Sequence, residues 1–142
     1  YWLVPPQSFC SVVIAYIGAV VPQVIESCDE LNHDSPGSTA VLAITSADRL
    51  HRGWMEAQRM RYNGLEKCSA QVEKLLGAID TNVRIVTVTD GHPSVLTWLG
   101  AVAGHRVCGL GVDRYGESGT LTELYRAYHL DSESILSACR SS

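Results

Sequence analysis

The sequence has little positive charge, and this limits the partners it can bind. It contains 11 Lys and Arg residues against 15 Asp and Glu residues, a formal net charge of −4. Attraction between basic side chains and phosphates supplies much of the affinity of nucleic-acid-binding proteins. Because no basic stripe is present, we expect no nucleic-acid partner.

Long hydrophobic runs are also missing. The most apolar stretch, SVVIAYIGAVVPQVI at 11–25, is interrupted by Gly18 and Pro22, and no basic segment precedes it. A membrane-spanning helix needs about 20 apolar residues, and a secretory signal begins with a basic region. The sequence therefore predicts no membrane segment, and 11–25 is interpreted as containing a buried strand.

Metal-binding and disulfide patterns are absent as well. The five cysteines are scattered without CxxC spacing, and the five histidines show neither HxH nor HxxxH spacing. Structural zinc sites use such closely spaced pairs. We expect reduced thiols in a reducing compartment, namely a bacterial cytoplasm, with mitochondria as the alternative. No metal-ligating residue is predicted.

The most prominent feature of the sequence is a set of four apolar runs rich in β-branched residues. Near-continuous apolarity is typical of strands covered on both faces, as in parallel sheets, and a helical pattern follows each run. The order predicts an α/β fold, a three-layer α/β/α sandwich with a mostly parallel sheet. The predicted strands are 10–18, 39–45, 83–90 and 106–112.

Capping residues delimit the predicted helices. Pro22 suits a first helical turn, and Ser46 is a predicted N-cap for the helix ending at 62–64. Thr120 and Glu123 have the spacing of a capping box, and Asp131 precedes a last helix. A single helix is predicted from Pro93 to Ala103, and a loop at 32–38.

The turn DGHP at 90–93 is one candidate site, at the end of a strand where ligands collect in open α/β sheets. Asp90 could orient His92 as a general base. The alternative is that Asp90 and Gly91 form the turn and Pro93 begins the next helix.

The glycine-rich stretch GVDRYGESG at 111–119 is a second candidate. It lacks the order of dinucleotide-binding and phosphate-loop motifs, and Asp113 and Glu117 would repel an anion. Ser118 does not lie in the GxSxG context of a hydrolase nucleophile. We therefore interpret the stretch as a strand-to-helix turn, and Asp90, His92 and Ser118 remain candidates for a ligand crevice only.

Two other polar groups are interpreted structurally. The helix RLHRGWMEAQRMR at 49–61 is expected to present a solvated basic face with Trp54 turned inward, partner binding being the alternative. Arg126, with Tyr125 and Tyr128, is expected to serve packing and hydrogen bonding. No catalytic residue is assigned.

The segment from 86 to 136 resembles a known family. DGHP, an apolar helix, the turn YGESG and LYR occur in the order seen in the C-terminal domain of transketolase-like thiamine-diphosphate enzymes. Within that family the sequence is most similar to the homodimeric pyruvate dehydrogenase (acetyl-transferring) component. The segment ITSADRLHRGWMEAQR and the opening YWL also resemble parts of it, so the resemblance covers nearly the whole chain.

The resemblance implies an oxidoreductase that decarboxylates pyruvate with thiamine diphosphate and Mg²⁺ and transfers the acetyl group to lipoyl. It also implies that the cofactor is held by preceding domains at a dimer interface. The family's G-D-G…N motif is absent from this chain, so no cofactor-binding residue is assigned here. The partners that the resemblance implies for this chain are those preceding domains, the second subunit of a homodimer, and the lipoyl-bearing acyltransferase of a multienzyme complex.

On this basis residues 1–8 are predicted to be a linker from a preceding domain, and 9–142 a single transketolase C-terminal-type domain. Tyr115 departs from the Phe usual in the family, and the loop 32–38 is longer than expected. Two alternatives remain open: a regulatory domain that binds a small molecule near Asp90, His92 and Ser118, and an oligomerisation domain.

Overall fold

The computed structural model describes residues 1–65, 67–114, 116 and 118–141. Within these ranges the elements alternate as the sequence predicts, with one extra strand at the start. The strands are β1 (Trp2–Val4), β2 (Val12–Ile17), β3 (Thr39–Ala43), β4 (Arg84–Thr89) and β5 (Val107–Leu110). The helices are α1 (Val21–Asp34), α2 (Ala47–Tyr62), α3 (Gln71–Leu76), α4 (Ser94–Thr97), α5 (Leu99–Ala103), α6 (Leu121–Ala127) and α7 (Ser132–Arg140).

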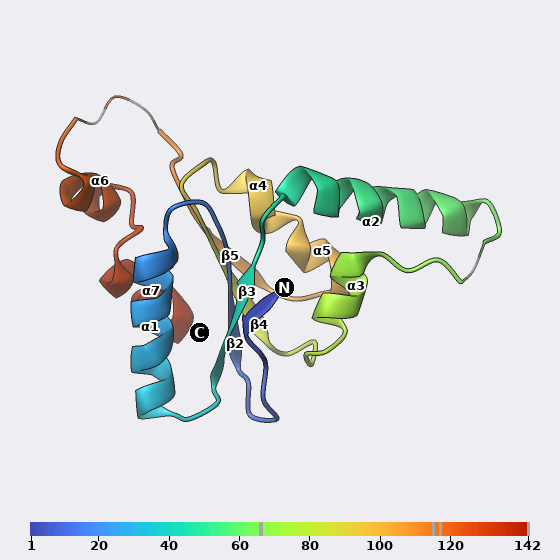
Figure 1. Cartoon of the computed structure of the whole chain (residues 1–142), viewed down its shortest axis with the longest axis horizontal. Coiled ribbons are helices and arrows are strands. Elements are labelled where there is room, and N and C mark those ends of the chain that lie inside the picture. Colours follow the sequence, from blue (N-terminus) through green and yellow to red (C-terminus); the bar gives the residue numbers. More distant parts are fainter. Residues whose placement is uncertain (66, 115, 117, 142) are drawn as a thin grey trace.

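The described strands form one sheet in the order β1-β3-β2-β4-β5. β3, β2, β4 and β5 are parallel to their neighbours, whereas β1 is antiparallel to β3. Figure 1 shows α1, α6 and α7 on one side of the sheet and α2 to α5 on the other. The predicted three-layer α/β/α sandwich with a mostly parallel sheet is confirmed.

Successive side chains of the central strands point to opposite faces of the sheet, and both faces are buried. Val13 and Ala15 of β2 face the core beneath α2, α3, α4 and α5, while Ile14 and Tyr16 face the core beneath α1 and α7. Complete burial of an aliphatic side chain contributes about 1.5–3 kcal/mol. Because β2 is buried on both sides, its sequence is continuously apolar, which is why it could be recognised.

The helix boundaries confirm several predictions. Pro22 lies in the first turn of α1, and Ser46 and Asp131 occupy the N-cap positions of α2 and α7. Thr120 and Glu123 form the predicted capping box of α6: the Thr120 N–H donates to Glu123 Oε2 at 2.8 Å, and the Glu123 N–H donates to Thr120 Oγ1 at 3.4 Å.

Two predicted boundaries are wrong. The expected helix from Pro93 to Ala103 is divided at Trp98 into α4 and α5. The expected loop at 32–38 is shorter, because α1 continues to Asp34. The side chain of Asn32 explains this: its amide group accepts from Thr39 N and donates to Thr39 O, both at 3.0 Å. It thereby ties the last turn of α1 to β3.

The segment predicted to be a linker contributes β1. Trp2 pairs with Leu42 at the edge of the sheet, and the Tyr1 ammonium donates to Ala43 O at 3.0 Å. This strand is not among those predicted from the sequence. Its origin as a linker from a preceding domain stays a prediction.

The long helix α2 extends away from the sheet (Figure 1). Trp54 packs against the core and stacks on Trp98 with ring centroids 5.4 Å apart, and Arg49, Arg52 and Arg59 are exposed. Trp54 is turned inward and these three arginines are solvated, as predicted, whereas Arg61 is half-buried and donates to Glu73. The alternative that this helix binds a partner stays a prediction. Within the described residues, no helix is long and apolar enough to cross a membrane.

Candidate functional site

The strand order creates a switch point between β2 and β4. The chain leaves β2 through α1 toward β3 and later crosses back to β4 on the other side of β2. In open α/β sheets the loops diverge at such a point and leave a crevice at the carboxyl ends of the strands. Here the two loops are 18–20 and 90–93.

The carboxylate of Asp90 bridges this crevice. The Ala19 N–H donates to Asp90 Oδ2 at 2.8 Å. Gly18, at φ +97°, makes this approach possible, because a Cβ at that position would overlap the Asp90 carboxylate. Asp90 therefore joins the loop after β4 to the loop after β2, rather than meeting His92.

The imidazole of His92 instead interacts within its own turn. His92 Nδ1 accepts from the Ser94 N–H at 3.2 Å and lies 2.7 Å from Ser94 Oγ. This arrangement holds the start of α4. His92 is exposed, and neither ring nitrogen bonds to a carboxylate among the described residues.

Ser118 is exposed and takes part in no hydrogen bond within the described residues. Tyr115 and Glu117, which the sequence analysis also singled out, lie outside the described residues. The structure thus brings none of Asp90, His92 and Ser118 into a hydrogen bond with another of the three. Their role as ligand contacts stays a prediction.

Three of the five cysteines are packing groups rather than nucleophiles. All five are free thiols. Burial raises the pKa of the Cys139 thiol to about 12, and burial also raises the pKa of Cys10 and Cys28. Because the thiolate is the reactive form, these three side chains remain protonated near neutral pH and act as packing groups.

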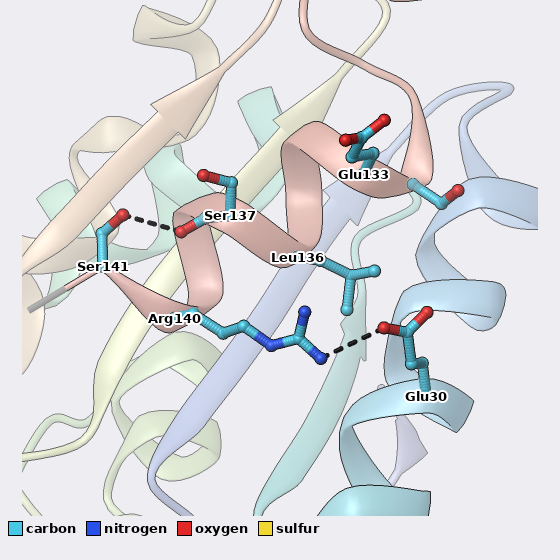
Figure 2. Close-up of a pocket in the computed structure, with 7 residues that line it drawn as sticks. Glu30, Glu133, Leu136, Ser137, Arg140 and Ser141 are labelled. Atoms are coloured by element: carbon cyan, nitrogen blue, oxygen red, sulfur yellow. Dashed lines mark hydrogen bonds and ion pairs between the residues drawn. The ribbon is translucent and has the colours of Figure 1, made fainter.

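The surface between α1 and α7 holds a shallow polar groove of about 610 Å³. Figure 2 shows Arg140 of α7 reaching across it toward Glu30 of α1. Arg140 Nη2 donates to Glu30 Oε1 at 3.1 Å and to Asp34 Oδ2 at 3.0 Å. Since both acids already neutralise the guanidinium, this groove fastens α7 to α1 and offers no unpaired cation.

A second groove, of about 320 Å³, lies between α1, α6 and the start of α7. We call it the α6 groove. Tyr125 closes one wall, and its hydroxyl donates to Ala19 O at 3.5 Å, which agrees with the hydrogen-bonding role predicted for it. Arg126 is exposed, and its expected packing and hydrogen-bonding role stays a prediction. The charged residues and the one amide that line the groove are Gln23, Glu26, Arg126, Asp131 and Glu133.

The α6 groove cannot be recognised from the sequence, because its walls come from segments about a hundred residues apart. Gln23 and Glu26 are single polar residues on the exposed side of an amphipathic helix, and nothing near them in the sequence marks a site. Only the contact between α1 and α7, strengthened by Ser27 Oγ donating to Ser132 O at 3.2 Å, brings them beside residues 121–133.

Comparison with solved structures identifies the architecture. The chain aligns over its whole length with the transketolase of Campylobacter jejuni at a TM-score of 0.65 and 16% identity, covering 18% of that chain. It has a transketolase-like C-terminal α/β fold. The transketolase of Leishmania mexicana gives a TM-score of 0.62 and 14% identity over 99% of this chain and 17% of its own.

A split-gene transketolase, described as an inactive β4 tetramer, gives a TM-score of 0.61 and 16% identity over 99% of this chain and 41% of its own. The chain therefore spans less than half of each of these transketolases. At the level of sequence, no family model and no curated protein matches it.

Proposed function

We propose that this chain is the C-terminal, structurally supporting domain of a transketolase-type thiamine-diphosphate enzyme. The observation that carries the proposal is the fold, which matches a transketolase over the whole chain but over only 18% of the transketolase. The switch-point crevice also supports it. A carboxylate of the protein itself bridges this crevice, so a purely structural domain accounts for the geometry at the strand ends.

Within this family, we propose that the parent enzyme is a pyruvate dehydrogenase component. The motifs DGHP, YGESG and LYR support this choice. Such an enzyme decarboxylates pyruvate and transfers the acetyl group to lipoyl. Its partners would be a second subunit and a lipoyl-bearing acyltransferase.

The residues of this chain do not fit thiamine diphosphate and Mg²⁺. The G-D-G…N motif is missing from the sequence, and no three His, Cys, Asp or Glu side chains in the described ranges are placed to hold a metal. Mg²⁺ is usually bound through one or two carboxylates together with phosphate oxygens and water, and the motif that holds metal and pyrophosphate in the resembled family is the one missing here. The cofactor would therefore be held by the preceding domains of the same polypeptide.

Titration calorimetry tests the supporting role. Thiamine diphosphate with MgCl₂, titrated into the 142-residue chain, is expected to give only heats of dilution. Saturable binding with a stoichiometry near one would contradict the proposal. The choice of enzyme is tested separately on the parent protein, which is expected to decarboxylate pyruvate and not to transfer a ketol group from xylulose 5-phosphate.

Oligomerisation is a second candidate function, favoured by the surface of α2. Met55 and Tyr62 on this helix and Leu65 after it are 50%, 85% and 57% exposed. A contiguous exposed apolar patch is typical of a protein–protein interaction site, and these three residues would form such a patch if they meet on one face of the helix. Light scattering at increasing concentration is expected to show self-association that Tyr62→Ser weakens. A monomer at all concentrations would contradict this function.

The regulatory alternative at the switch point has its own test. A metabolite that binds near Asp90, His92 and Ser118 would raise the melting temperature of the chain, and His92→Ala would abolish the rise. If every stabilising metabolite acts equally on His92→Ala, the crevice is not the binding site.

A further inference from the structure

We propose that the outer face of α2 pairs with the same face of a second copy of this chain, so that the two helices run antiparallel about a two-fold axis. The proposal rests on the second function proposed above, self-association, and specifies the surface, the orientation and the register of the pairing. It is carried by the order of charges along α2, by a groove in the surface of this helix and by its exposed apolar side chains.

Five exposed side chains lie in one line along the outer face of α2. They follow one another at intervals of four and three residues, the spacing at which helical side chains share one face and at which paired helices meet. Trp54 and Ala57 lie on the opposite face, against the core. We call the exposed line the α2 stripe, and its members are Asp48, Arg52, Met55, Arg59 and Tyr62.

A groove of about 530 Å³ lies within the α2 stripe. The residues that line it are Arg52, Met55, Glu56 and Arg59, which stand at positions i, i+3, i+4 and i+7 of one helix. Four residues with this spacing form the hole that receives a side chain of the facing helix when two helices pack together. The groove therefore has the form of a site for a second helix.

The order of charges favours an antiparallel copy. In a parallel pair in register, Arg52 and Arg59 would each face their own like charge. A two-fold axis between Gly53 and Trp54 instead places Asp48 opposite Arg59 of the second copy, and the reciprocal contact follows because a two-fold interface is self-complementary. Within one copy Asp48 Oδ2 lies 3.5 Å from Arg52 Nη2, so this carboxylate would meet one cation from each copy.

The same register gives partners to the remaining residues at the centre. Glu56, exposed beside the stripe, falls next to Arg49 and Arg52 of the second copy. Arg52 also lies opposite Met55 of the second copy, whose side chain is 50% exposed. The methylene stem of an arginine covers apolar surface while its guanidinium reaches a carboxylate. Each acid of the outer face thus meets an arginine across the axis.

A register chosen from the apolar residues alone is less favourable. Placing Met55 opposite Tyr62 of the second copy moves the axis toward Arg59. The two copies of Arg59 would then meet each other, and like charges in direct contact repel. The axis between Gly53 and Trp54 avoids this contact, so the charges determine the register.

The pairing is expected to be weak and sensitive to salt. Each helix contributes 16 residues, and interfaces below about 1,200 Å² are typical of transient complexes. A Kd of about 0.1–1 mM at low ionic strength is therefore expected. Because exposed charges are screened by salt, raising NaCl from about 20 mM to about 500 mM should weaken the dimer about fivefold.

Analytical ultracentrifugation of the whole chain with two charge variants tests the pairing. The acidic variant carries Arg49→Glu and Arg59→Glu, and the basic variant carries Asp48→Lys and Glu56→Lys. Each variant alone places like charges across the axis and is expected to remain monomeric. An equimolar mixture restores every opposite-charge contact and is expected to form a heterodimer, which also shows that both variants are folded.

A matched control changes the net charge by the same amount away from α2. Lys74→Glu combined with Arg106→Glu, both at exposed positions, is expected to leave the Kd of the homodimer within about twofold of that of the unsubstituted chain, because neither residue lies on the α2 stripe. A control that abolishes dimerisation as fully as the acidic variant would overturn the proposal, since net charge alone would then explain the loss.

The remaining outcomes separate this pairing from self-association in general. Dimers that form equally at both salt concentrations and in both charge variants would overturn the pairing and leave self-association standing. A mixture of the two variants that stays monomeric, while the unsubstituted chain dimerises, would overturn the register. An unsubstituted chain that is monomeric at every concentration would overturn self-association and the pairing together, and the outer face of α2 would then belong to a different partner.

Discussion

At the scale of single residues, two glycines show how the backbone conformation determines the effect of a substitution on stability. Gly18 has φ +97°, and a side chain there would overlap Asp90, whereas Gly53 lies within α2 with nothing near its missing Cβ. The same substitution should therefore have opposite effects at the two positions.

Gly18→Ala is expected to lower the free energy of unfolding by about 2–4 kcal/mol, because it strains the backbone and separates Asp90 from the Ala19 N–H. Gly53→Ala is expected to raise it by about 0.5–1 kcal/mol, because alanine favours a helix interior. Urea denaturation followed by circular dichroism measures both. If Gly18→Ala and Gly53→Ala change the free energy of unfolding equally, the hydrogen bond between Asp90 and the Ala19 N–H does not stabilise the fold.

The ion pair between Arg61 and Glu73 gives a pH-dependent prediction. Arg61 Nη2 donates to Glu73 Oε1 at 2.6 Å, and the Ala70 N–H donates to Glu73 Oε2 at 2.7 Å. The Arg61 hydrogen bond, with the backbone bond from Ala70, lowers the pKa of Glu73 below its ordinary value of 4.5. The carboxylate therefore stabilises the fold above the unfolded-state pKa, and this contribution is lost as the pH falls through the lower folded-state pKa.

Glu73→Gln is expected to cost about 1–2 kcal/mol of unfolding free energy at pH 7. The difference from the unsubstituted chain should shrink as the pH falls below 4.5. Urea denaturation at a series of pH values measures this difference. A constant difference from pH 7 to pH 3 would count against a stabilising role for the ionised carboxylate.

At the scale of elements, α6 is expected to depend on its N-terminal cap more than the longer helices α1, α2 and α7 do. It has seven residues and none is buried, and isolated helices of this length are unstable in water. The box formed by Thr120 and Glu123 satisfies backbone N–H groups that the first turn leaves free. It also positions Tyr125 against Ala19.

Thr120→Ala is expected to destabilise α6 by about 1 kcal/mol, and thus to speed amide hydrogen exchange over 121–127 roughly fivefold. Thr122→Ala is the matched control, since Thr122 is exposed on the same helix and alanine is the better helix former there. If both substitutions accelerate exchange alike, the capping box is not what stabilises α6.

The elements that the sequence predicted are those with local signals. Continuous apolarity marked β2, β3, β4 and β5, and the proline and capping residues marked the starts of α1, α2, α6 and α7. β1 lacked such a signal, because its three residues are held by pairing with β3, about forty positions away. The break at Trp98 was also missed, since nothing in the neighbouring sequence distinguishes two short helices from one.

The same reasoning separates the two candidate sites. The turn at 90–93 was found because its residues are adjacent, but the partner of Asp90 is 71 positions away, so its contact could not be predicted. The α6 groove could not be predicted at all, because its acidic residues lie on segments that meet only in the folded chain.

At the scale of the whole molecule, the sheet links two separate cores. Trp2, Trp54 and Trp98, which are all three tryptophans of the chain, pack against the core beneath α2 to α5. Ile135 is buried in the opposite core, beneath α1 and α7. Tryptophan fluorescence therefore reports one face of the sheet, whereas circular dichroism reports both.

Ile135→Ala is expected to cost about 2–5 kcal/mol. Since β2 and β4 belong to both cores, it should shift the fluorescence and circular dichroism transitions together. Leu76→Ala, in the core that contains the tryptophans, is the matched variant and should behave alike. A fluorescence transition unmoved by Ile135→Ala would show that the two faces unfold separately.

The contact between Asp90 and Ala19 also has an evolutionary consequence. The carboxylate of Asp90 occupies the switch point of this sheet. An anion from solution would have to compete with it for the Ala19 N–H, and Asp90, being part of the same chain, is present there at a very high effective concentration. Replacing Asp90 by a smaller neutral residue would leave the Ala19 N–H and the open backbone of Gly18 unoccupied. One substitution would thus open the crevice at the switch point without changing the topology of the sheet.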